Sequence, residues 1–142
     1  MNTFKKSVLL GLIFIFSSCY KEPSNQSLNS TFFNNEKVFS QLVEYISKQP
    51  LLYLTIEKCN VEDCFAKFPK DIREFFIKEK FVKIEFTSQK GRWGIELTVY
   101  KSRIFNSGTQ KGFYYTNVPE LTGGNYTSMP LKNGWFLFDI AL

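Results

Sequence analysis

The chain predicts an α+β domain in which one or two helices pack on a curved antiparallel sheet of about five strands. Two observations lead to this fold class. The first part of the domain has apolar residues at the spacing of an amphipathic helix, whereas from Phe81 onward apolar and polar residues alternate as in half-buried strands. Helices that precede a run of hairpin-linked strands favour an antiparallel sheet with the helices gathered on one face.

The first helix is expected over residues 36–47. Apolar residues there fall on one stripe of a helix, namely Val38, Phe39, Leu42, Val43 and Ile46. Asn34 or Asn35 is suited to cap its start, and Pro50 ends it because proline cannot continue a helix. A short β-prone run over residues 51–56 then predicts a buried strand.

A second, shorter helix is expected to begin near Pro69. The apolar residues that follow are spaced three and four apart, at Ile72, Phe75 and Phe76. Residues 82–86 and 93–99 then alternate on either side of a turn that contains Gly91, which predicts a β-hairpin.

The remaining strands are marked by their turns. A second hairpin is expected from residues 103–105 and 112–116, with its turn at Ser107-Gly108. Asn133-Gly134 is a strong two-residue turn signal, and it leads into a last strand over residues 135–140.

Composition and charge limit the classes of function. Of the 142 residues 18% are aromatic, so a single domain over residues 36–142 has enough apolar side chains for a core without a metal or cofactor. The chain carries 18 Lys and Arg against 13 Asp and Glu, a net charge of +5. These charges are mixed along the chain, as in Lys78-Glu79-Lys80, whereas nucleic-acid binding normally needs a concentrated basic surface. We therefore expect no cofactor and no nucleic-acid partner.

The first nineteen residues have the parts of an export signal. Lys5 and Lys6 give a basic start, residues 8–16 form an apolar run, and Ser17-Ser18 supplies small residues directly before Cys19. An apolar run of about ten residues is too short to span a membrane, which takes roughly twenty.

A cysteine directly after these small residues makes the segment resemble the signal of bacterial lipoproteins, although Phe16 stands where that pattern usually has leucine. The resemblance implies that residues 1–18 are a signal peptide and are removed, and that Cys19 becomes acylated. Loss of the two signal lysines lowers the net charge from +5 to +3. The alternatives are a secreted protein cleaved near Ser18 and a signal that is retained as an anchor.

Residues 19–35 are expected to form the lipidated cysteine and a flexible tether, since this segment contains Pro23 and is rich in Ser and Asn. Tyr20 follows the cysteine where an aspartate would direct a lipoprotein to the inner membrane. The resemblance therefore implies a cell-envelope location, with the outer membrane favoured. Its implied partner is the membrane, held by acyl chains that contribute about 0.8 kcal/mol for each buried methylene.

Acylation of Cys19 leaves Cys59 and Cys64 as an even pair in an oxidising compartment, where disulfides persist. A bridge between them closes a short loop and stabilises the domain by about 2 kcal/mol. The alternatives are two free thiols and a metal or redox site. A metal site is disfavoured because the chain has no histidine, and a redox pair because the gap is four residues rather than two.

The sequence offers little for catalysis. Without histidine there is no Ser-His-Asp or Cys-His arrangement, and neither a P-loop nor a dinucleotide-binding glycine pattern occurs. Glycoside hydrolysis needs only two carboxylates. Glu85 and Glu96 lie on the polar face of the first hairpin, so they are either such a pair or two solvated charges beside Lys83 and Arg92.

Aromatic residues also gather between residues 111 and 129. Tyr114, Tyr115 and Tyr126 stand near turn-forming Pro and Gly, and tyrosines on loops bind sugars or protein partners because the ring is apolar and the hydroxyl polar. The other interpretation is that these rings fill the core. We expect a membrane-anchored envelope lipoprotein with a non-enzymatic domain that binds a protein or a glycan. The alternative is a small hydrolase that uses Glu85 and Glu96 or a tyrosine.

Overall fold

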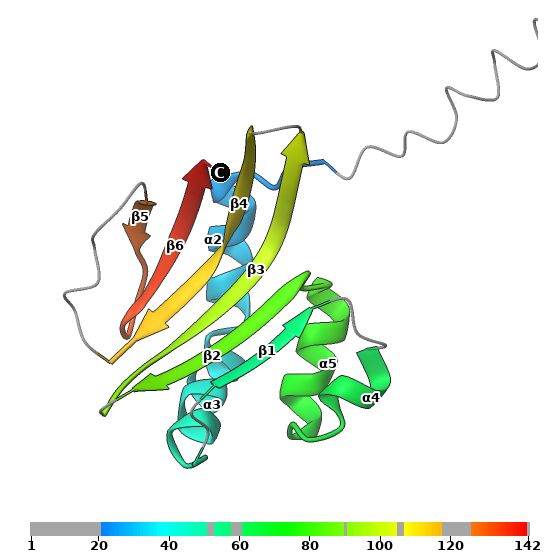
Figure 1. Ribbon diagram of the computed structural model, residues 1–142, viewed down its shortest axis with the longest axis vertical. Coiled ribbons are helices and arrows are strands. Elements are labelled where there is room, and N and C mark those ends of the chain that lie inside the picture. Colours follow the sequence, from blue (N-terminus) through cyan, green and yellow to red (C-terminus); the bar gives the residue numbers. More distant parts are fainter. Residues whose placement is uncertain are drawn as a thin grey trace, which may run out of the picture.

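The computed structural model confirms the α+β class and describes residues 21–50, 53–57, 61–89, 91–104, 107–117 and 126–141. Within these residues the elements follow in the order α2 (Asn25–Asn34), α3 (Glu36–Ser47), β1 (Tyr53–Glu57), α4 (Val61–Phe65), α5 (Lys70–Glu79), β2 (Lys83–Gln89), β3 (Arg92–Ile104), β4 (Ser107–Thr116), β5 (Tyr126–Pro130) and β6 (Trp135–Ala141). The six strands form one antiparallel sheet in the order β1-β2-β3-β4-β6-β5. In Figure 1 the strands pass in front of α2 and α3, and α5 lies beside β1. Buried side chains of α2, α3 and α5 form one core with those of the strands, so these helices pack on one side of the sheet.

The side of the sheet that faces the helices is an aromatic core. Phe39 of α3 lies at its centre and is almost fully buried. Its ring centroid is 4.7 Å from that of Phe32, 5.2 Å from Phe75, 5.0 Å from Phe113 and 4.8 Å from Trp135. Rings at these separations gain attraction beyond the burial of their area, so side chains from three helices and two strands hold the layers together.

Both predicted helices are confirmed. The helix over residues 36–47 is α3, although the side chain of Asn35 does not cap it and instead donates to the backbone oxygen of Thr31 over 2.7 Å. The helix near Pro69 is α5, which ends at Lys80 in a left-handed conformation with φ of 53°.

The flexible tether expected over residues 19–35 differs from the structure, because residues 25–34 form the helix α2. The side chain of Ser24 caps it by accepting from the backbone N–H of Ser27, and Leu28 and Phe32, one turn apart, are each only 2% exposed in the core. The folded domain therefore begins with α2 rather than at residue 36. Only these two side chains enter the core, and the polar residues around them obscured the helical pattern.

The first hairpin is confirmed as β2 and β3, but the second is arranged differently. β3 does not stop near residue 99; it continues to Ile104, so a single long strand pairs with β2 along one edge and with β4 along the other. Ser107 and Gly108 lie inside β4, paired with Ile104 and Arg103, and are not the turn. The last strand is confirmed as β6, and Asn133 and Gly134 reach it through positive φ angles.

Candidate functional site

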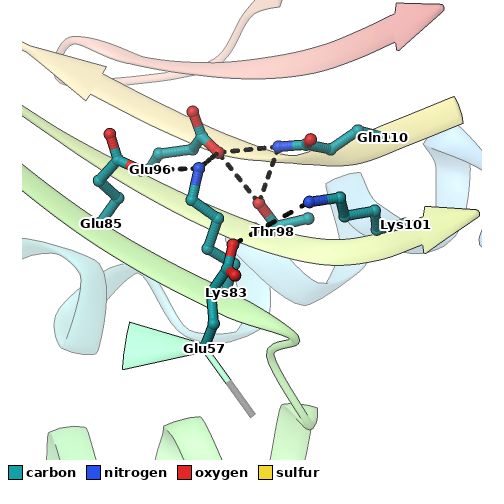
Figure 2. Close-up of polar contacts among 7 residues, drawn as sticks. All are labelled: Glu57, Lys83, Glu85, Glu96, Thr98, Lys101 and Gln110. Carbon is teal, nitrogen blue, oxygen red and sulfur yellow. Dashed lines mark hydrogen bonds and ion pairs between the residues drawn. The ribbon is translucent and has the colours of Figure 1, made fainter. Parts of the chain in front are cut away.

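The other side of the sheet carries no helix among the described elements, and we call it the outer face. Because side chains alternate along a strand, the residues next to the core residues point to this face. Ile84 and Phe86 of β2 face the helices, so Lys83 and Glu85 face outward, opposite Thr98 and Glu96 of β3. Figure 2 shows these side chains together with Gln110 from β4.

The centre of the outer face is an ion cluster of one lysine and two glutamates. Glu85 and Glu96 lie on the same face, as the alternation of the first hairpin predicts, and the register of β2 and β3 makes them direct cross-strand partners. Lys83 lies between them, with its Nζ 2.7 Å from Glu85 Oε2 and 3.1 Å from Glu96 Oε1. The three side chains are only 17–23% exposed, so they are partly withdrawn from water rather than freely solvated.

Two neutral side chains complete this cluster. Gln110 Nε2 donates to Glu96 Oε1 over 2.8 Å and to Thr98 Oγ1 over 3.1 Å, while Thr98 Oγ1 donates to the same carboxylate oxygen over 3.1 Å. Both Thr98 and Gln110 are buried. We call the five residues the polar cluster: Lys83, Glu85, Glu96, Thr98 and Gln110.

A β-bulge determines which residues flank the polar cluster. The register between β3 and β4 shifts between Thr98 and Tyr100, so that Lys101 and not Tyr100 is the partner of Gln110 on the outer face. Lys101 then reaches toward Glu57 of β1, at 4.0 Å (Figure 2). Alternation along β3 already places Thr98 on the same face as Glu96. The sequence pattern did not identify Gln110 as a neighbour of Glu96, because the pairing of β3 with β4 depends on a bulge that leaves no clear local signal.

The carboxylates keep Lys83 charged. Burial opposes its charge and would lower its pKa, but the hydrogen bonds and charges of Glu85 and Glu96 together outweigh burial, so the pKa of Lys83 lies above its usual value. The polar cluster therefore holds one fixed cation between two carboxylates, a pattern of hydrogen-bond donors and acceptors spread over three strands.

This geometry bears on the hydrolase hypothesis. A general acid must hold a proton that it can donate, yet Glu96 Oε1 accepts hydrogen bonds from Lys83, Thr98 and Gln110. A cavity of about 500 Å³ lies elsewhere, against β1 and α4, and is lined by residues that include Leu54, Ile56 and Phe68. Neither Glu85 nor Glu96 lines that cavity.

The three candidate tyrosines are not on one surface. Tyr114 and Tyr115 lie in β4 rather than on a loop. Tyr114 is opposite Glu96 on the outer face, and its hydroxyl lies against Gly94, where an added Cβ would be 3.1 Å away. Tyr115 points the other way, with its ring centroid 5.0 Å from Trp93 and 5.4 Å from Trp135.

The remaining candidates fall largely outside the described residues. The backbone of Tyr126 begins β5, but its side chain lies outside the description, as do Cys19 and Cys59. Cys64 is half-buried in α4. The disulfide between Cys59 and Cys64 therefore stays a prediction.

Among the described side chains, no three or more Cys, Asp and Glu residues gather as a metal site would need. No helix in the described ranges is long and apolar enough to cross a membrane.

No family model, curated protein or solved structure matches the chain.

Proposed function

We propose that the protein is a lipid-anchored lipoprotein of the bacterial envelope, with the outer membrane favoured, and that its domain binds an envelope glycan on the outer face without catalysing a reaction. The resemblance of residues 1–19 to a lipoprotein signal supports the anchor. The observation that supports binding is the position of the polar cluster, directly beside the ring of Tyr114 on a sheet face without described helices.

The chemistry of this face suits a sugar. Sugar hydroxyls both donate and accept hydrogen bonds, and the polar cluster offers an ammonium group, carboxylates and an amide within a small area. The apolar face of a sugar ring packs on an aromatic ring such as that of Tyr114. A protein partner is the alternative occupant, and the test below distinguishes the two.

The absence of catalysis is also a proposal, supported by the bonding of the two glutamates. Glycoside hydrolysis needs one carboxyl group that donates a proton and a second that acts as base or nucleophile. Here Lys83 bridges both carboxylates at 2.7 Å and 3.1 Å, so both accept from the same ammonium group. The same contacts orient both groups for hydrogen bonding to a ligand.

The anchor is tested by the intact mass of the protein purified from its own membranes, with and without reductant. We expect the loss of residues 1–18 and the added mass of two or three acyl chains at Cys19. A further gain of two hydrogens on reduction would support the bridge between Cys59 and Cys64. An unmodified Cys19 would contradict the anchor and leave a soluble exported domain with an odd thiol.

Glycan binding is tested by sedimenting the detergent-solubilised mature protein with purified cell-wall sacculi and, separately, with lipopolysaccharide. We expect Tyr114→Ala to weaken the interaction about tenfold, because an aromatic contact contributes about 1.4 kcal/mol. Lys70→Ala is the control, since this exposed lysine lies on α5 away from the outer face. If neither glycan sediments the protein, and cross-linking at the outer face instead yields an envelope protein, the glycan proposal is wrong.

A further inference from the structure

The first described residues are held against the sheet by an ion cluster. Lys111 Nζ of β4 lies 2.6 Å from Glu22 Oε1 and 3.0 Å from Asp139 Oδ2 of β6. The lysine side chain is only 12% exposed, and α2 begins a few residues later behind the cap of Ser24. The chain is therefore fixed to the domain from Glu22 onward.

This contact lies at one particular end of the sheet. Lys111 is the cross-strand partner of Asp139, two pairs in from Thr109 and Ala141, which form the last pair of β4 and β6 at this end. In Figure 1 the blue start of the described chain runs past this end, where the arrowheads of β3 and β6 and the C-terminus also lie. We call it the anchor end, represented by Lys101, Thr109, Lys111, Asp139 and Ala141.

Only two residues of chain, Tyr20 and Lys21, lie between Cys19 and Glu22, so three residue-to-residue steps join them. Since an extended residue spans at most about 3.6 Å, the α-carbon of Cys19 lies no more than about 11 Å from that of Glu22. A flexible tether of fifteen residues would instead let the domain turn freely at an average reach on the order of 20 Å. A connection this short keeps this end of the sheet close to Cys19 and therefore close to the membrane that would hold it.

We propose that the anchor end faces the lipid headgroups of the membrane that holds Cys19, and that the strands extend away from that surface. The inference rests on the proposed acylation of Cys19. Charge does not oppose the arrangement, because the exposed Lys21 offsets the excess negative charge of the Glu22, Lys111 and Asp139 cluster. Tether length, and not charge, sets the orientation.

The opposite end of the sheet is then far from the membrane. Arg92 begins β3, ten residues before Ser102, which pairs with Thr109 at the anchor end. Ten strand residues span roughly 33 Å. The outer face then runs along the membrane normal and is accessible from the side.

The experiment uses the acylated mature protein in vesicles of phosphatidylethanolamine and phosphatidylglycerol that contain a headgroup quencher. A fluorophore is attached to Ala141→Cys at the anchor end or to Arg92→Cys at the far end, two exposed positions, under non-reducing conditions. We expect quenching at least twofold stronger at position 141 than at position 92.

Two matched variants test the cause of the orientation. Glu22→Gln weakens the ion cluster and should reduce the difference between the two labels. Glu44→Gln should leave the difference unchanged, because Glu44 pairs with Lys48 on α3 and not with a residue of the anchor end. An equal effect of both variants would contradict the role of Glu22.

The outcomes separate this inference from the proposed anchor. Protein that floats with the vesicles but is quenched equally at both positions overturns the orientation and leaves the lipoprotein proposal intact. Protein that carries no acyl mass and does not float overturns both.

Discussion

The two faces of the sheet use the same strands but are stabilised in different ways. On the helix side, neighbouring strands contribute Ile84, Phe86, Ile95 and Leu97, all almost fully buried. On the outer face, alternate residues of the same two strands form the polar cluster together with Gln110 of β4, and its members are joined by directed hydrogen bonds and ion pairs. Alternation along β2 and β3 thus produces an apolar core and a polar surface from one hairpin.

The two faces of the sheet differ in how well they tolerate amino-acid substitutions. Apolar packing is not directional, and cores accept altered side chains if the volume is kept. The polar cluster needs Lys83, Glu96 and Gln110 to meet from three strands, so it depends on the register of each pair. A slip of one residue would turn every one of these side chains to the other side. We expect mutations on the two faces to differ in size and in their dependence on pH.

The largest effect is expected from Phe39→Ala on the core side. Removing a ring that contacts Phe32, Phe75, Phe113 and Trp135 leaves a cavity among side chains of several elements. The free energy of unfolding should fall by about 3–5 kcal/mol, as measured by urea denaturation. A loss below about 1 kcal/mol would mean that Phe39 is not central to the core.

Gly112→Ala should have the next largest effect, on the outer face itself. An added Cβ at this buried position would collide with the backbone oxygen of Leu97, beside the β-bulge, and backbone cannot move aside as a side chain can. We expect a loss of about 2–3 kcal/mol in the same denaturation experiment. Gly91→Ala is a useful comparison, because a Cβ there meets no atom and only the positive φ of 79° opposes it.

Lys83→Met should cost less than either, about 1 kcal/mol, since a pair this close to water is partly screened. The substitution leaves Glu85 and Glu96 facing each other without the cation between them. The loss should shrink when Glu96→Gln is already present, which a double-mutant cycle measures. Strictly additive effects of the two substitutions would contradict the bridge.

The same lysine gives the outer face an alkaline pH dependence. Because the folded pKa of Lys83 lies above its ordinary value of 10.5, its stabilising contribution is fully present below pH 10.5 and is lost as the pH rises through the folded value. The difference in unfolding free energy between the native protein and Lys83→Met should therefore stay constant near neutral pH and decrease above pH 10.5. Phe39→Ala should show no such convergence with the native protein.

The smallest effect is expected from Lys70→Ala. Lys70 forms an ion pair with Glu74 on α5, and both side chains are exposed to solvent. Such pairs contribute less than about 0.5 kcal/mol, and added salt screens them. The loss of unfolding free energy is compared with that of Lys83→Met at the same ionic strength. If Lys70→Ala costs as much as Lys83→Met, exposed and partly buried ion pairs stabilise this protein equally.

Much of the fold was predictable because its signals are local. The apolar stripe of α3 and the alternation in β2 and β3 each depend on residues a few positions apart, and the structure confirms both. The shared face of Glu85 and Glu96 followed from the same alternation, whereas their direct pairing depends on the strand register. Elements with few core residues were missed: α2 buries only Leu28 and Phe32 in a polar segment, and α4 and β5 have five residues each.

The sequence by itself determined the class of the fold and the apolar stripe of α3, because each is a pattern of neighbouring residues. The export-like pattern over residues 1–19 is of the same local kind and stays a prediction. Only the tertiary structure decided that Gln110 joins Glu96, that Tyr114 and Tyr115 serve opposite faces, and that Lys111 holds Glu22. These contacts join residues far apart in the chain, and they depend on strand register, on a bulge and on the packing of α2. The period of a sequence specifies which side of a strand a residue takes, but not which distant residue meets it there.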